Sequence, residues 1–211
     1  MLDRWTLTLI KPPLKRLARG CDQQGIRANQ VTLAGFALGM LVVPLLGFQL
    51  YTLALIAVLL NRLADGLDGE LARLQGATDG GALLDIVLDF IFYAAVVAGF
   101  ALANPADNAL AAAFLLWGFM GTASSFLAYA ILAERRKLSS MTYPSKGFYY
   151  LEGLAEGTET IAFLVAMCLF PGHFVGLAWA FFGLCVITTA TRVVGGYHSL
   201  KDDPATARQD V

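Results

Sequence analysis

Residues 51–73 decide the fold of this chain, and they read YTLALIAVLLNRLADGLDGELAR. The first ten of these residues suit a membrane helix, whereas the stretch from Asn61 onward carries charged groups. Polar side chains in a membrane segment are costly unless they line a protected cavity or lie at the interface. The stretch therefore predicts a helix whose second half leaves the lipid or lines a cavity.

The composition of the whole chain also points to a bilayer. Of 211 residues, 57% are hydrophobic and 15% are charged, and the mean hydropathy of +0.64 is too high for an ordinary soluble domain. Six apolar segments approach the roughly 20 residues that cross a membrane, near residues 30–49, 51–74, 80–103, 109–134, 155–171 and 174–195. We expect an all-α integral membrane protein with six transmembrane helices and an N-terminal amphipathic interfacial helix.

The positions of the basic residues predict the orientation in the membrane. All fifteen Lys and Arg fall on one side of the six-span arrangement, and the opposite connections, residues 47–51, 102–108 and 170–174, carry none. Because Lys and Arg in short loops collect on the cytoplasmic side, we expect both termini to be cytoplasmic in a multi-pass protein of the bacterial inner membrane. The net charge of −1 gives no argument for a nucleic-acid partner.

Three parts of the chain are expected. Residues 1–28 form an amphipathic arm suited to the headgroup layer, although a basic tail that only fixes topology is the alternative. Residues 29–197 form the membrane domain, and residues 198–211 form a cytoplasmic tail. The three cysteines are odd in number and lack CxxC spacing, which predicts packing residues rather than disulfides or a zinc site.

The acidic residues of two consecutive helices are the candidate chemistry. Helical spacing places Asp65 and Asp68 on one face, and it places Asp85 and Asp89 one turn apart on the next helix. Four close carboxylates near a bilayer repel one another and lose hydration unless protons or cations hold them there. Hard oxygen ligands favour Mg²⁺, Mn²⁺ or Ca²⁺. The alternative, interfacial acids paired with nearby arginines, leaves surplus negative charge, while Glu70 and Asp79 are expected to be solvated or capping residues.

These residues resemble the signature of the CDP-alcohol phosphatidyltransferase family, Asp-x-x-Asp-Gly-x-x-Ala-Arg, a spacer, and Gly-x-x-x-Asp-x-x-x-Asp. The matching positions are Asp65, Asp68, Gly69, Ala72, Arg73, Gly81, Asp85 and Asp89. Asn29-Gln30-Val31-Thr32 is similar to the Asn-x-x-Thr that often precedes the first span in this family. The spacer between Arg73 and Gly81 has seven residues where the family pattern has eight, which we interpret as a shortened turn.

The resemblance implies a metal-dependent enzyme that transfers a phosphatidyl group from a CDP-linked donor, CDP-diacylglycerol above all, to an alcohol acceptor with release of CMP. It implies that Asp65, Asp68, Asp85 and Asp89 hold Mg²⁺ or Mn²⁺, and that Asp89 is also the catalytic base. It further implies a homodimer in membrane lipid, and a CDP-binding site at Asn29, Thr32, Gly69, Ala72, Arg73 and Gly81.

The acceptor alcohol is not decided by any residue. Arg135, Arg136 and Lys146 are candidates for binding a phosphate on a polar acceptor, but a charge run that only fixes topology is an equal alternative. Two other functions remain in view, a divalent-metal carrier or channel that uses the same aspartates, and a catalytically inactive lipid-binding homologue. The acids gather on two consecutive helices without an internal repeat, which is unlike a carrier, and no motif aspartate is missing.

Overall fold

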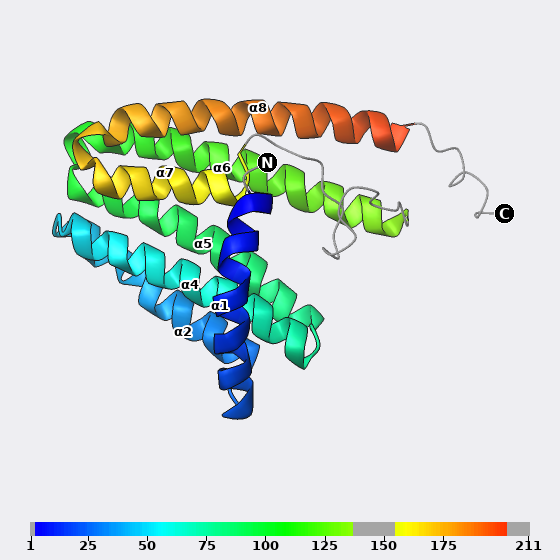
Figure 1. Ribbon diagram of the computed structural model, residues 1–211. Helices are drawn as coiled ribbons and strands as arrows, with labels where there is room; N and C mark the ends of the chain where they lie inside the picture. The colour runs from blue at the N-terminus through cyan, green and yellow to red at the C-terminus, as the bar shows by residue number, and fades with distance from the viewer. Residues whose placement is uncertain (1–2, 137–154, 202–211) are drawn as a thin grey trace. The chain divides into compact units, whose positions relative to one another are not determined.

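The computed structural model describes residues 3–136 and 155–201, which form helices joined by short connections (Figure 1). In chain order these elements are α1 (Asp3–Gln23), α2 (Ala28–Met40), α3 (Val42–Gly47), α4 (Tyr51–Gln75), α5 (Asp79–Ala103), α6 (Pro105–Arg135), α7 (Gly157–Leu169), the 3-10 turn η1 (Pro171–His173) and α8 (Phe174–Lys201). The described residues therefore confirm the all-α prediction.

Four stretches of described helix are long and apolar enough to cross a membrane, namely Ala28–Gly47, Asp79–Ala103, Pro105–Arg135 and Pro171–Lys201. Helix α4 has sufficient length but turns polar halfway, and the described part of α7 has 13 residues. The protein is thus an all-helical membrane protein, while the count of six spans stays a prediction.

The first expected span is divided into two helices at Leu41. Pro44 lies four residues after Met40, and a proline ring crowds the carbonyl group four residues before it while offering no N–H. Helix α2 accordingly ends at Met40 and α3 begins at Val42.

The chain forms two compact units, Met1–Ala113 with Gly157–Ala178, and Phe114–Glu156 with Trp179–Val211. In the first unit Phe92, Phe100 and Phe174 are fully buried, and the rings of Phe100 and Phe174 stack with centroids 4.6 Å apart. In the second unit α6 and α8 approach closely, since a Cβ atom at Gly121 would lie 2.8 Å from Thr189 Oγ1.

Cys168 and Cys185 are buried, as expected of packing residues, whereas Cys21 is half-buried. A Cβ atom at Gly118 would lie 3.0 Å from the Cβ atom of Cys185. Cys185 therefore packs into the close contact between α6 and α8.

Helix α1 packs across α4, as Figure 1 shows. The buried Leu14 of α1 covers Gly66 of α4, where a Cβ atom would lie 3.0 Å from Leu14 Cδ1. Gln75, the last residue of α4, ties the same elements together through three hydrogen bonds. Its amide nitrogen donates to Asp22 Oδ1 and to the Ile26 carbonyl, and its amide oxygen accepts from the Ala28 backbone N–H.

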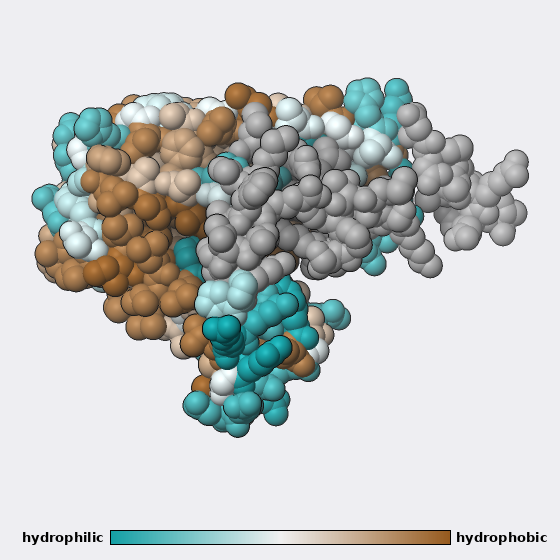
Figure 2. All heavy atoms as spheres, in the orientation of Figure 1, coloured by the Kyte–Doolittle hydropathy of each residue, from teal (hydrophilic) through white to brown (hydrophobic). Residues whose placement is uncertain are grey.

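The first unit exposes apolar side chains, as expected of surfaces that meet lipid. Leu38 of α2 and Leu59 of α4 are each about half exposed. Figure 2 shows apolar residues gathered over α2 and α4, while polar residues gather near α1. The second half of α4 carries charged residues, among them Asp65, Asp68 and Glu70.

Gly35 sets the distance between α2 and α4, and Gly35→Ala is expected to destabilise the protein. A Cβ atom at Gly35 would lie 2.4 Å from Ala64 Cβ and 3.7 Å from Ala64 Cα, and neither atom can move without its helix. Overpacking of this kind costs about 1–3 kcal/mol, so thermal unfolding in detergent should begin several degrees lower. Gly20→Ala is the control, because nothing lies within 4 Å of a Cβ atom there; equal unfolding temperatures would contradict the close contact.

Candidate active site

A cleft opens among α2, α4 and α5, within the first compact unit. All four motif aspartates line it, together with Thr32 of α2 and Arg62 of α4. It holds about 250 Å³ of empty space, including its open mouth. The packing of these helices thus brings both pairs of aspartates to one place.

Three of the aspartates form a group that suits a metal ion. One carboxylate oxygen from each of Asp65, Asp68 and Asp85 lies within 4.8 Å of the others. Ligand oxygens around one Mg²⁺ ion lie at most about 4 Å apart, so small side-chain rotations would close the group around an ion. The expectation that α4 and α5 present facing carboxylates is confirmed for these three residues.

Asp68 shows why the group needs a cation. Its side chain is 5% exposed, and its Oδ2 atom is buried without a hydrogen-bond partner. A buried carboxylate oxygen without a partner carries a large desolvation cost. A divalent cation ligated by oxygens would supply the missing partner, so the donor set and the orphaned atom both fit Mg²⁺ or Mn²⁺.

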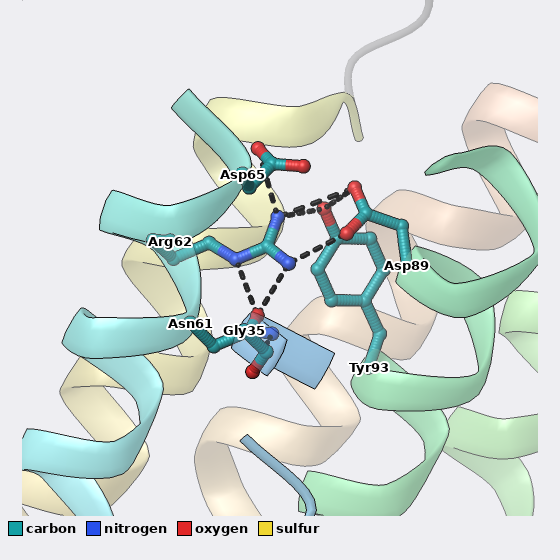
Figure 3. A network of polar contacts seen from close by, with 6 residues as sticks. All are labelled: Gly35, Asn61, Arg62, Asp65, Asp89 and Tyr93. Carbon is teal, nitrogen blue, oxygen red and sulfur yellow. Dashed lines mark hydrogen bonds and ion pairs between the residues drawn. The ribbon is translucent and has the colours of Figure 1, made fainter. Parts of the chain in front are cut away.

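Asp89 contacts Arg62 and Tyr93 (Figure 3). Its Oδ1 accepts from Arg62 Nη2 at 2.6 Å, and its Oδ2 accepts from Arg62 Nη1 at 3.2 Å. The Tyr93 hydroxyl donates to Oδ2 at 3.0 Å. The same guanidinium also lies 3.5 Å from Asp65 Oδ2, so one arginine links the fourth aspartate to the metal-binding group.

Arg62 is itself held in place by its neighbours. Asn61 Oδ1 accepts from Arg62 Nε at 3.0 Å and also from Nη2. Asn61 Nδ2 in turn donates to the Gly35 carbonyl at 3.1 Å. The guanidinium carbon lies 5.1 Å from the ring centroids of both Phe92 and Tyr93, a distance at which the aromatic faces attract the cation.

The shortened spacer forms a tight connection between α4 and α5. Gly76 adopts φ +93°, a conformation that residues with a side chain rarely adopt, and Thr78 caps α5 by accepting from the Gly81 backbone N–H at 3.1 Å. One carboxylate oxygen from each of Asp65, Asp68 and Asp85 lies within 4.8 Å of the others. The short spacer therefore still allows the aspartates of α4 to lie beside Asp85 of α5. Asp79 follows the cap as an exposed first-turn residue, which confirms the expectation for it.

The expected CDP-binding residues lie around the same cleft. Thr32 lines it, and a Cβ atom at Gly81 would lie 3.0 Å from Asn29 Oδ1, so Asn29 and Gly81 are direct neighbours. Gly69 is open, since a Cβ atom there would meet only Arg73 Nη2 at 4.0 Å. Ala72 is half-buried. Their role in binding a nucleotide stays a prediction.

Glu70 is buried, so the expectation that it is a solvated or capping residue is wrong. Its side chain is 5% exposed, and its Oε1 accepts from Arg73 Nη1 at 2.5 Å. The reason is spacing, because residues three apart on a helix are neighbours and a buried carboxylate needs a cationic partner. Arg73 remains 62% exposed, so part of its guanidinium is still accessible.

The acceptor candidates belong to a different part of the chain. Arg135 is exposed at the end of α6, and Arg136 Nη1 donates to the Leu200 carbonyl of α8 within the second unit. Lys146 lies outside the described residues. All three assignments therefore stay predictions.

Two neighbours of the motif residues were not assigned to the site from the sequence: Asn61, which lines the cleft, and Tyr93, which donates to Asp89. For Tyr93 a signal was available, because it follows Asp89 by four residues and therefore lies on the same helix face. What spacing does not reveal is that this face of α5 meets Arg62 of α4.

Comparison with known proteins shows the family to which this chain belongs. The pattern that describes CDP-alcohol phosphatidyltransferases matches residues 26–191, which is most of the chain and includes every motif position. The chain belongs to this family. It is 53% identical over 201 residues to the inner membrane protein YnjF of Escherichia coli (strain K12), and this match covers 95% of this chain and 98% of that protein.

Other relatives of this family member are more distant. It is 34% identical over 94 residues to an archaetidylinositol phosphate synthase of Pyrococcus horikoshii, covering 44% of this chain and 50% of that protein. The fold is similar to that of Mycobacterium tuberculosis phosphatidylinositol phosphate synthase (PgsA1) with CDP-DAG bound, with TM-score 0.64 and 22% identity over 94% of this chain and 98% of that one.

A second structure of PgsA1, in complex with manganese and citrate, gives TM-score 0.64 and 21% identity over 94% of this chain and 93% of that one. At these identities the likeness shows the fold alone. The family, the fold and the similarity to an inner membrane protein together make this chain an integral, multi-pass protein of the inner membrane.

Proposed function

We propose that this protein transfers a phosphatidyl group from a CDP-linked lipid, CDP-diacylglycerol above all, to an alcohol acceptor and releases CMP. The observation that carries the proposal is the buried oxygen of Asp68, which lacks a partner inside a group of three carboxylates. Such a group suits a cation that neutralises phosphate oxygens. The CDP-DAG and manganese found with PgsA1 support the same donor and ion here.

Asp65, Asp68 and Asp85 would hold Mg²⁺ or Mn²⁺. When bound, the ion supplies positive charge that stabilises the transferring and leaving phosphate oxygens. The acceptor hydroxyl oxygen attacks the lipid-proximal phosphorus, forming a new P–O bond. The P–O bond to the cytidine-bearing phosphate breaks, CMP leaves with the bonding electron pair, and Asp89 takes the hydroxyl proton.

Orientation supplies the remaining advantage. The cleft holds the reacting groups at the polar half of α4, next to the exposed apolar surface of the first unit. A lipid donor held there keeps its acyl chains in the bilayer while its diphosphate faces the carboxylates. Holding two reactants in the correct geometry can lower a barrier by about 7–11 kcal/mol in favourable cases.

The test is CMP release by the purified full chain in detergent with Mn²⁺ or Mg²⁺. CDP-diacylglycerol is offered with serine, inositol, inositol phosphate, glycerol phosphate and choline in turn, and the lipid product is identified by mass. We expect CMP with one of these acceptors and none after EDTA treatment. Absence of CMP from CDP-diacylglycerol, CDP-choline-type and CDP-archaeol-type donors with every acceptor would overturn the proposal, and Mn²⁺ uptake by proteoliposomes would then favour a carrier.

Gly69→Ala is expected to weaken donor binding without weakening the fold. A methyl group there meets only the Arg73 guanidinium at 4.0 Å, and alanine stabilises a helix by about 0.5–1 kcal/mol relative to glycine. Under the proposed function, the same methyl group occupies surface that the nucleotide needs. A steric cost of about 1–3 kcal/mol is typical when a methyl group is added to a close contact, so the KM for CDP-diacylglycerol should rise about tenfold. The measurement is a donor titration beside a thermal unfolding curve.

The matched control is Gly80→Ala, another helical glycine with nothing within 4 Å of an added Cβ atom. It should leave the KM for the donor unchanged. An unchanged KM in Gly69→Ala as well would remove Gly69 from the nucleotide site.

A further inference from the structure

Glu70 and Arg73 form an ion pair of unequal burial on α4. Glu70 is buried, whereas the Arg73 side chain is 62% exposed, and Glu70 Oε1 accepts from Arg73 Nη1 at 2.5 Å. Burying a carboxylate costs hydration that an apolar residue at the same place would not lose. Burial alone therefore gives no reason for an acid at position 70, and the exposed end of the pair has to be considered.

The carboxylate lies on a part of α4 that α1 braces at two points. Glu70 follows Gly66 by four residues, so the two share a face of α4. Leu14 of α1 covers Gly66, where a Cβ atom would lie 3.0 Å from Leu14 Cδ1. At the end of α4, Gln75 Nε2 donates to Asp22 Oδ1 of α1 at 2.9 Å. Glu70 is therefore a fixed point to which a flexible side chain can be tied.

The guanidinium of Arg73 extends from this fixed point to the open surface at Gly69. Its Nη2 atom lies 4.0 Å from the place of a Cβ atom at Gly69, and no other atom of the described residues lies within 4 Å of that place. Guanidinium N–H groups bind phosphate oxygens through parallel hydrogen bonds. With Nη1 bonded to Glu70 and most of the side chain exposed, Arg73 suits a phosphate that lies over Gly69.

Tying down one nitrogen of an arginine has two opposite effects on the binding of a phosphate. An arginine that is already ordered does not lose its rotamer freedom when the ligand arrives, which strengthens binding by about two- to twelvefold. The negative charge of Glu70 acts in the other direction, but solvent screens it around an exposed guanidinium. The restraint is therefore the larger effect.

We propose that Glu70 is a positioning residue, which holds Arg73 over Gly69 so that the guanidinium binds a phosphate of the CDP-linked donor. The identity of the ligand rests on the proposed function. Glu70 itself does not touch the donor and acts only through Arg73. The family signature leaves this position unspecified, between Gly69 and Ala72, so the resemblance assigns it no role.

Two substitutions of Glu70 separate restraint from charge. The affinity of the purified full chain for CDP is measured by isothermal titration calorimetry with Mn²⁺ present. Glu70→Ala removes the anchor, so CDP should bind about two- to twelvefold more weakly. Glu70→Gln keeps an oxygen acceptor for Arg73 and removes the negative charge, so CDP should bind at least as tightly as to the wild type. The control is Glu134→Ala, an exposed glutamate of α6, which should change nothing.

The sign of the Glu70→Ala effect decides the matter. If Glu70 only neutralised Arg73, both variants would bind CDP more tightly than the wild type, and the proposal would be wrong. Unchanged affinity in Glu70→Ala would also refute it. Cytidine, which has no phosphate, should compete with CDP equally well in the wild type and in Glu70→Ala. A loss of cytidine affinity equal to the loss for CDP would show a general distortion of the site instead.

A double-mutant cycle with Arg73 shows whether Glu70 acts through that residue. Arg73→Ala should weaken CDP binding about tenfold or more, and adding Glu70→Ala should not weaken it further, since the residue to be positioned is gone. A second loss of the same size would contradict the proposal. Arg73→Ala leaves a buried carboxylate unpaired, so its unfolding temperature should fall. If it does not yield monodisperse protein, the Glu70→Ala and Glu70→Gln affinities decide alone.

The two proposals fail in different ways. A protein whose CDP affinities follow the expected pattern but which releases no CMP from any donor refutes the transferase and leaves the role of Glu70 intact. An active transferase whose Glu70→Ala variant binds CDP like the wild type refutes only the role of Glu70. A wild type that binds no CDP-linked ligand refutes both.

Discussion

Asp68→Asn is expected to lower CMP release by at least about 10³-fold, because it removes the buried oxygen on which the metal site depends. The same change should raise the unfolding temperature of the metal-free protein. Asp68 is 5% exposed with one oxygen lacking a partner, and it lies beside two other carboxylates. A neutral amide relieves that repulsion and desolvation, by about 1–3 kcal/mol.

The measurement compares unfolding temperatures with EDTA and with saturating Mn²⁺, beside CMP release. In the wild type, a ligand at 100 times its Kd stabilises the folded state by about 2.7 kcal/mol. Asp68→Asn should not show this stabilisation by Mn²⁺. Asp79→Asn is the control, since Asp79 is exposed in the first turn of α5 and should change neither result. A variant that is destabilised without metal and keeps the Mn²⁺ increment would contradict the assignment of Asp68.

Asp89→Asn is expected to abolish turnover for a different reason. Removing a general base typically costs 10²–10⁴-fold, and here it also leaves the guanidinium of Arg62 facing an amide that carries no charge. We expect kcat to fall at least about 10³-fold, and no excess of Mn²⁺ should restore it, because the lost group acts on the acceptor and not on the ion.

The decisive measurement is kcat at saturating donor across a wide range of Mn²⁺ concentrations. Recovery of kcat at high Mn²⁺ would show that Asp89 acts mainly by binding the ion. Asp107→Asn serves as the matched control, because Asp107 is an exposed first-turn residue that accepts from Asn104 and lies outside the cleft lining.

The polar half of α4 could be predicted because a change in hydropathy and a helical spacing of acidic residues coincide there. Apolar residues up to position 60 indicate a membrane helix, and Asp65 and Asp68 recur at the spacing of one helix face. Helix α5 has the same property at Asp85 and Asp89. Local spacing is enough to group residues on a helix, so the candidate carboxylates and the helical fold were predictable from the order of residues.

Other features depended on contacts between helices. Glu70 was expected in solvent, yet it is buried against Arg73, because the sequence does not state which face of α4 the neighbouring helices cover. The break at Leu41 follows from Pro44 only once the chain is known to be helical on both sides. The effect of the seven-residue spacer was also undetermined, since the relative height of two helices depends on how they pack.

The sequence by itself determined that this protein is a helical membrane protein with four aspartates on two consecutive helices, since hydropathy and helical periodicity act within single segments. Tertiary structure decided what those aspartates contact. One carboxylate oxygen from each of Asp65, Asp68 and Asp85 lies within 4.8 Å of the others. Asp89 contacts Arg62 and Tyr93. These contacts arise because Gly35 lets α2 approach α4, Asn61 and the aromatic rings fix the guanidinium of Arg62, and a buried carboxylate pairs with the nearest cation.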